Sequence, residues 1–213
     1  WEFGEPSSTA DYLYVQPTTL TQGGETEFQR DANAELVYCF NQNWSFPNDP
    51  GFSSGALDSA VYQEIPNATS EFFHELANQD SVKSGSSNQA PRVPAADLKD
   101  KVLPIVYNGM DASGSDRAGI QAHLANVGNE TEGIGLSDGE FYEATQQAIW
   151  YFTESVSERT LAAKWDAYTP ETKRAIYILI GKPLQGDENV QLQSVPEAEL
   201  NLYQNSDLYG PLG

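Results

Sequence analysis

Residues 137–150 read Ser-Asp-Gly-Glu-Phe-Tyr-Glu-Ala-Thr-Gln-Gln-Ala-Ile-Trp, and this stretch predicts the best-defined helix of the chain. Ser137 and Glu140 have the S-x-x-E spacing of a capping box, in which each side chain binds the backbone N–H of the other residue. Gln147 shares a face with acidic residues and should be solvated. Gln146 lies beside the buried stripe and should be half buried, so its carboxamide needs partners. The stripe has helical spacing and comprises Phe141, Ala144, Thr145, Ala148, Phe152 and Val156.

Around this helix the chain alternates between strand-like and helix-like segments. β-Prone runs predict strands at 12–15, 35–40, 60–65, 190–192 and 200–203. Apolar spacing predicts helices at 69–76, 96–107 and 115–126. The second of these should be distorted at Pro104 and should end at Gly109. A further helix should begin at Thr169-Pro170 and end at Gly181.

Strands followed by helices and then strands predict an α+β domain, in which the chain ends pair and the middle is an inserted helical part. We expect a single domain over residues 1–213. Its β-rich part, sandwich-like or barrel-like, should comprise residues 1–66 and 185–213, and its helical part residues 67–184. The chain starts abruptly at Trp1, so we expect it to be a piece of a longer protein.

Composition excludes several classes of partner. The 31 acidic and 11 basic residues give a formal charge of -20, whereas nucleic acids and anionic membranes bind cationic faces. No apolar run approaches the roughly 20 residues of a membrane span, so we expect no membrane insertion.

The lone cysteine, Cys39, has no partner for an intramolecular disulfide. It is therefore a buried small hydrophobe, a reactive thiol, or half of some other covalent bond. His74 and His123 invite a Cys–His enzyme interpretation, but no papain-like or caspase-like sequence surrounds the cysteine. The spacing of these residues does not suit zinc, and no loop has calcium-binding spacing, so we expect no metal.

Several segments together resemble the thioester domains found at the tips of Gram-positive surface adhesins and pili. The family has an aromatic-Cys-aromatic stretch, a Tyr-Asn-Gly segment, a Thr-Gln-x-Ala-Ile-Trp helix and a C-terminal strand, in that order. The matching segments are Tyr38-Cys39-Phe40, Val106-Tyr-Asn-Gly109, Thr145-Gln-Gln-Ala-Ile-Trp150 and Leu200-Asn-Leu-Tyr-Gln204. The resemblance thus covers most of the chain.

This resemblance implies a thioester between Cys39 Sγ and the Gln146 side-chain carbonyl, formed with loss of ammonia, where the cysteine strand meets the glutamine helix. Gln147 is the alternative acyl residue. No cofactor is implied. We expect the site to be lined by Tyr38, Phe40, Tyr107, Asn108, Thr145 and Trp150, with Tyr107, Asn108 and Thr145 as candidate donors to an oxyanion.

The implied function is attachment of a bacterium to a host surface or matrix protein through a lysine amine, without catalytic turnover. Fibrinogen is a target of some members of the family. The expected location is the bacterial cell surface, with anchoring to the cell wall through parts of the parent protein absent from this sequence. Two other functions stay open: a non-covalent ligand-binding domain and a cysteine-dependent acyl-transfer enzyme.

Overall fold

The computed structural model describes residues 2–4, 12–17, 31–38, 59–61, 63–65, 92–111, 115–127, 135–153, 165–196 and 202–204. The chain divides into two compact units. The strand unit comprises residues 1–39, 43–68 and 199–213, and the helical unit comprises residues 40–42 and 69–198. The predicted helix at 69–76 lies outside the described residues.

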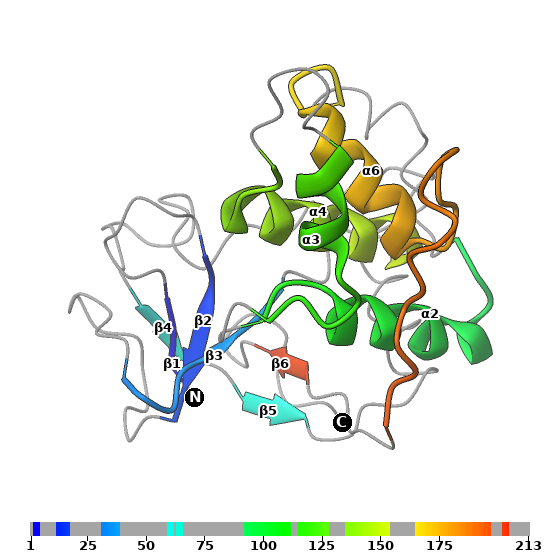
Figure 1. Cartoon of the computed structure of the whole chain (residues 1–213). Coiled ribbons are helices and arrows are strands. Elements are labelled where there is room, and N and C mark those ends of the chain that lie inside the picture. Colours follow the sequence, from blue (N-terminus) through cyan, green and yellow to red (C-terminus); the bar gives the residue numbers. More distant parts are fainter. Residues whose placement is uncertain are drawn as a thin grey trace. The chain divides into compact units, whose positions relative to one another are not determined.

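The described residues of the strand unit form two small antiparallel sheets (Figure 1). In the first, Phe3 is in register with Val15 on one side and with Ala60 on the other. The second sheet pairs a strand from the first third of the chain with one near its C-terminal end, as the expected pairing of the ends requires. The first sheet has the order β3-β2-β1-β4, from β1 (Glu2–Gly4), β2 (Tyr14–Gln16), β3 (Glu35–Leu36) and β4 (Ser59–Val61). The second contains β5 (Gln63–Ile65) and β6 (Leu202–Gln204).

Several strands differ from the predicted ones. The run predicted as one strand at 60–65 is two strands in different sheets. Of the run at 35–40, the structure describes residues 35–38, and within these the strand is 35–36. Residues 190–192 form no strand and belong to the helical unit, so the strand predicted there is wrong. Alternation of apolar and polar residues indicates that one side of a segment is buried. A strand also requires a neighbouring strand to hydrogen-bond with, and the sequence pattern does not reveal that neighbour.

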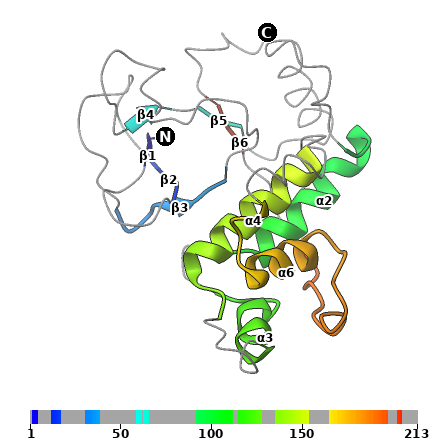
Figure 2. The same cartoon turned by 90° about the horizontal axis from the view of Figure 1, so that it is seen from above.

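The helical unit has four described helices: α2 (Ala95–Asn108), α3 (Ile120–Val127), α4 (Asp138–Thr153) and α6 (Pro170–Leu179). Helix α4 packs against α2 and α6, and α3 packs against α6. Figure 1 shows α4 between α2 and α6, and Figure 2 shows the same helices from above. Their shared core is aliphatic and aromatic, and includes Leu98, Val102, Ile105, Leu124, Phe141, Ile176 and Leu179. None of the described helices has the length and hydropathy of a membrane span.

The ends of α6 match the prediction. Thr169 is the N-cap and its Oγ1 accepts a hydrogen bond from the Thr172 N–H (3.2 Å), while Pro170 occupies the first turn. Gly181 follows the helix with a φ of 73°, a left-handed conformation that glycine adopts without strain. Pro104 is accommodated inside α2.

Helix α3 begins at Ile120, later than the predicted residue 115. The side chain of Asp116 accepts a hydrogen bond from the Ala122 N–H (2.9 Å), which is the role of a residue that precedes a helix. Gly119 has a φ of 70°, so the chain turns sharply before the helix starts. Asx side chains compete with the helix for backbone N–H groups in this way.

The C-terminal end of α4 is fastened by a segment from elsewhere in the helical unit. The backbone N–H of Arg92 donates to the Phe152 carbonyl (3.0 Å), and Arg92 Nε donates to the Tyr151 carbonyl (2.8 Å). The guanidinium also lies 4.0 Å from the centre of the Tyr151 ring. On the same tyrosine, Lys182 Nζ donates to the hydroxyl (2.7 Å). Carbonyls of the last helical turn, which have no partner within a helix, are therefore satisfied.

Candidate functional site

Helix α4 starts with the predicted capping box. The Ser137 N–H donates to Glu140 Oε2 (3.0 Å), and the Glu140 N–H donates to Ser137 Oγ (3.3 Å). Partial burial alone would raise the pKa of Glu140, but the hydrogen bonds from Ser137 and Thr169 outweigh it and hold the pKa below its ordinary value. The carboxylate is thus kept ionised at the N-terminus of the helix, where negative charge is favourable.

Both glutamines of the motif are buried, since Gln146 and Gln147 are each only 4% exposed. The prediction that Gln147 is solvated is wrong, and Gln146 is buried rather than half buried. The helical-wheel argument assumes one buried face, whereas α4 packs against both α2 and α6. Twelve of the sixteen residues of α4 are buried, so burial does not distinguish the two glutamines.

The Gln147 amide has a defined partner on its own helix. Its Nε2 donates to Glu143 Oε1 (2.9 Å), which also accepts a hydrogen bond from the Tyr168 hydroxyl (2.6 Å). Burial, together with the hydrogen bond to the Glu143 carboxylate, raises the pKa of Tyr168 above its ordinary value, so the hydroxyl stays a donor. The predicted shared face of Gln147 and Glu143 is confirmed. The Gln147 amide is part of a structural network between α4 and the segment before α6.

Thr145 joins two of the matched segments of the helical unit. Its Oγ1 accepts a hydrogen bond from the Met110 N–H (3.1 Å) and donates one to the Phe141 carbonyl (2.8 Å). The backbone at Gly109 approaches so closely that an added Cβ would lie 2.6 Å from Thr145 Oγ1. The Tyr-Asn-Gly segment that ends α2 is therefore seated on α4 one residue before Gln146. Gly109 has a φ of -77°, so it ends α2 through close packing rather than through a left-handed turn.

Asn108 is fully buried and completely hydrogen-bonded. Its Nδ2 donates to the Pro104 carbonyl (2.8 Å) and to the Gln193 carbonyl (3.0 Å), while its Oδ1 accepts from the Gln193 N–H (2.8 Å). An amide group has two N–H donors, and both are occupied. The single hydroxyl proton of Thr145 is likewise used. Neither residue has a hydrogen to offer an oxyanion in this arrangement, so the donor roles expected of Asn108 and Thr145 are not supported, and Tyr107 is the remaining candidate.

The other predicted site residues are placed as follows. Tyr107 is half-buried beneath Arg117, whose guanidinium lies 4.8 Å from the ring centre and donates to the Tyr107 carbonyl (2.8 Å). Trp150 is 7% exposed. Tyr38 is half-buried. Cys39 and Phe40 lie outside the described residues, so the predicted thioester stays a prediction.

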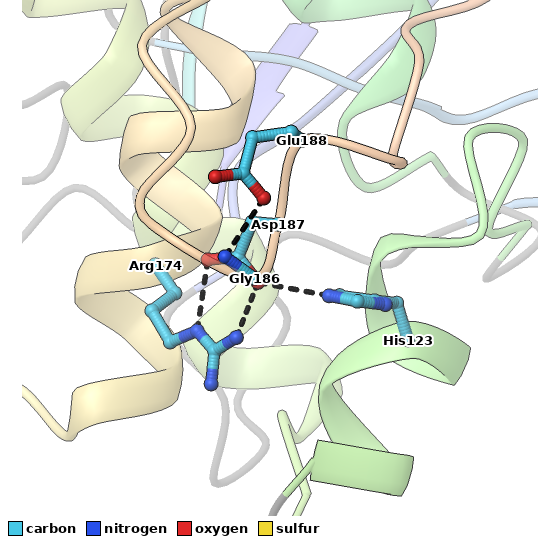
Figure 3. A network of polar contacts seen from close by, with 5 residues as sticks. All are labelled: His123, Arg174, Gly186, Asp187 and Glu188. Atoms are coloured by element: carbon cyan, nitrogen blue, oxygen red, sulfur yellow. Dashed lines mark hydrogen bonds and ion pairs between the residues drawn. The ribbon is translucent and has the colours of Figure 1, made fainter.

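A polar network that the sequence did not predict links three segments of the helical unit (Figure 3). Asp187 has a fully buried side chain and accepts hydrogen bonds from His123 Nε2 (2.8 Å), Arg174 Nε (2.9 Å) and Arg174 Nη2. Burial would raise the pKa of Asp187, but the hydrogen bonds from Arg174 and His123 outweigh it and hold the pKa below its ordinary value.

This network engages His123, one of the two histidines that invited a Cys–His enzyme interpretation. Its Nε2 contacts a carboxylate held by an arginine, which is a structural ion-pair arrangement. His74, the other histidine, lies outside the described residues. Within the described part of the chain, no three His, Cys, Asp or Glu side chains gather as metal ligands would.

The chain is similar to known bacterial surface proteins. It is 29% identical over 119 residues to the pilus tip adhesin Cpa of Streptococcus pyogenes, a match that covers 56% of this chain and 13% of that protein. The chain therefore spans only about an eighth of the length of this curated relative.

Two solved structures share its fold. One is the N-terminal domain of the Streptococcus pyogenes pilus tip adhesin Cpa, with a TM-score of 0.55, 22% identity, and coverage of 95% of this chain and 81% of that one. The other is the N-terminal thioester domain of the fibronectin-binding protein SfbI from Streptococcus pyogenes, with a TM-score of 0.52, 19% identity, and coverage of 95% and 86%.

The model of one protein family, the thioester domain, matches residues 36–184. The match covers more than half of the 213-residue chain and contains the segments around Cys39, Asn108 and Gln146. The chain belongs to the thioester domain family.

Proposed function

We propose that this domain is a covalent adhesion module, in which Cys39 Sγ and the side-chain acyl group of Gln146 form an internal thioester that reacts with a lysine amine. The observation that carries the proposal is the Thr145–Trp150 segment within the family match over residues 36–184. Gln146 rather than Gln147 is proposed because it is the first glutamine of the Thr-Gln-x-Ala-Ile-Trp segment, the position on which the family motif places the bond.

The chemistry consists of two acyl transfers. In the first, Cys39 Sγ attacks the Gln146 carboxamide carbon, the C–S bond forms and the C–N bond breaks; the proton of the thiol passes to the departing nitrogen, which leaves as ammonia. In the second, an amine nitrogen attacks the thioester carbon, the C–S bond breaks, and the thiolate takes the proton that the nitrogen loses. The product is an amide and a free thiol. The domain is consumed in the second step, so it is a single-use reagent rather than an enzyme.

The proposed partner is a host surface or matrix protein that presents an accessible lysine. The relatives include a pilus tip adhesin and a fibronectin-binding protein, which supports a role at the bacterial cell surface. Anchoring to the cell wall would come from other parts of the parent protein. The charge of -20 favours approach to lysine-rich surfaces at low salt. Fibrinogen remains a candidate through the family resemblance.

We also propose that residues 1–213 act as one thioester domain, with the strand unit as its sandwich-like or barrel-like part. Two other functions would need different chemistry. A non-covalent binding domain would hold its ligand without using Cys39, and a cysteine-dependent enzyme would modify an excess of substrate.

Intact-mass spectrometry tests the proposal. The wild-type protein should have a mass one ammonia below that of its sequence and no titratable thiol. Methylamine should add to Gln146 and release the thiol of Cys39. Cys39→Ala and Gln146→Ala should have full sequence mass and ignore methylamine, whereas the matched control Gln147→Ala should keep the thioester. A wild-type protein of full mass with a titratable thiol would overturn the proposal.

A further inference from the structure

Trp150 carries a polar group that the fold leaves unsatisfied. The side chain is 7% exposed, and its buried Nε1 has no hydrogen-bond partner. Among the described residues, one other buried side-chain atom is in this state, Asp116 Oδ1. Buried indole N–H groups usually find an acceptor, because leaving one unpaired is unfavourable. A buried donor without an acceptor therefore requires an explanation, and a functional role is one.

The position of Trp150 on α4 indicates which group its N–H can serve. Trp150 follows Gln146 by four residues, so the two side chains share one face of the helix. Side chains in a helix lean toward its N-terminus, and a long side chain covers the turn before its own Cα. By this geometry we expect the indole of Trp150 to cover the turn that carries Gln146.

The neighbouring polar groups on this stretch of α4 are committed elsewhere. The Thr145 hydroxyl donates to the Phe141 carbonyl, and the Gln147 amide donates to Glu143. Asn108, at the end of α2, uses both amide hydrogens on backbone carbonyls. The indole N–H is thus the one side-chain donor, of those just considered, that remains unused.

We propose that the Trp150 Nε1–H donates a hydrogen bond to the side-chain carbonyl oxygen of Gln146, both in the thioester and in the tetrahedral intermediates before and after it. This inference rests on the proposed function and deepens it. When sulfur or an amine adds to the carbonyl carbon, that oxygen gains negative charge. A donor fixed in a buried site stabilises this charge without reorganisation. No proton leaves the indole; when the intermediate collapses, the oxygen becomes neutral again and the leaving group departs.

The test compares two variants that lack the indole N–H with one matched control. Trp150→Phe keeps an aromatic ring, and replacement of Trp150 by β-(3-benzothienyl)alanine keeps the size of the ring system. The control is Trp165→Phe, because Trp165 is half-buried in the same unit and packs edge-on against Tyr168 and Tyr177. Thioester content is measured by intact mass, and the rate constant of methylamine addition by a mass time course.

Removing one donor to an oxyanion slows acyl transfer by about 10²-fold or more. Both Trp150 variants should therefore react with methylamine about 10²-fold more slowly than wild type, or fail to form the thioester, with a melting temperature close to that of wild type for the benzothienyl variant. Trp165→Phe should react at the wild-type rate. A benzothienyl variant that forms the thioester and reacts within twofold of wild type would overturn the inference while leaving the proposed function intact.

A second measurement compares the two chemical states of the wild-type protein, and variants serve only to assign its signals. The chain has four tryptophans, and the indole Nε1–H signals of Trp150 and Trp165 can be followed by nuclear magnetic resonance, with Trp150→Phe and Trp165→Phe used to assign the two signals. Conversion of the thioester to the methylamide should shift the Trp150 signal and leave that of Trp165 in place. An unmoved Trp150 signal would overturn the inference. Wild-type protein of full sequence mass would overturn the proposed function, and the inference with it.

Discussion

Replacing Asp187 by asparagine should destabilise the helical unit more than any single loss of surface charge. Asp187 accepts hydrogen bonds from His123 on α3 and from Arg174 on α6, while its own segment follows α6 (Figure 3). The carboxylate is acceptor-only, so both partners must donate to it. An asparagine at this position keeps one acceptor oxygen and presents an N–H₂ group to two donors.

The expected loss of stability depends on how deeply Asp187 and its two partners are buried. Removing one partner of a buried ion pair costs about 3–5 kcal/mol when the other is left in a dry interior. Here the side chains of Arg174 and His123 keep 21% and 23% exposure. Water can therefore replace part of the loss, and we expect about 2–3 kcal/mol. For a chain of this size that corresponds to a fall in melting temperature of about 4–12 °C.

Urea unfolding and thermal denaturation at neutral pH measure the effect. The matched control is Glu188→Gln, which removes the neighbouring carboxylate, whose hydrogen bond from the Gly186 N–H (2.8 Å) is exposed. The control should change the free energy of unfolding by less than about 0.5 kcal/mol. The reasoning would be refuted if Asp187→Asn were as stable as wild type, or if both variants lost the same stability.

The dependence on pH has a definite sign. The pKa of Asp187 is held below its ordinary value of 3.8 in the folded protein. Its contribution to stability is therefore fully present above that ordinary value and is lost as the pH falls through the folded value. The difference in stability between wild type and Asp187→Asn should be constant at neutral pH and shrink in acid below about pH 4. A difference that grows on acidification would contradict this assignment.

Two further changes test how the Tyr-Asn-Gly segment is seated. Gly109→Ala should lower the free energy of unfolding in urea by about 1–3 kcal/mol, because the new Cβ would lie 2.6 Å from Thr145 Oγ1 and 2.8 Å from the Ile105 carbonyl oxygen. Adding Thr145→Ser removes Thr145 Cγ2, which also clashes with this Cβ, and should recover part of the loss. If the effects of the two substitutions on stability simply added, the contact would be contradicted. Asn108→Ala should lower the free energy of unfolding by about 1–3 kcal/mol, because it leaves buried backbone groups unpaired. The Gln193 N–H should also exchange its hydrogen faster in the variant, since it loses its acceptor. Unchanged protection of this N–H would argue against the hydrogen bond to Asn108.

Local chemistry made the helix ends predictable. The capping box at Ser137 and Glu140 and the Thr169-Pro170 start depend on contacts within three residues, so they can be read from the sequence. The late start of α3 is also local, but the side chain of Asp116 competes with the helix for backbone donors in a way that apolar spacing does not reveal.

Tertiary contacts were the part that the sequence could not supply. Gln147 shares a helix face with Glu143, as predicted, yet it is buried because a neighbouring segment supplies Tyr168 to the same carboxylate. The Asp187 network draws its members from positions 123, 174 and 187, and no spacing rule connects them. The committed hydrogens of Asn108 and Thr145 likewise depend on partners that only the fold brings near.

The restraints on α4 have a consequence for the proposed chemistry. The helix is held near its N-terminus by the hydrogen bond from Thr169 to Glu140, near its middle by Thr145 and Met110, and at its C-terminus by Arg92. A helix fixed at three points cannot easily shift when the charge on a carbonyl in its middle changes. Electrostatic stabilisation of an oxyanion is strongest when the donor needs no reorganisation. If Gln146 is the acyl residue, loosening any of these restraints should slow its reaction with amines even though none of them touches the reacting atoms.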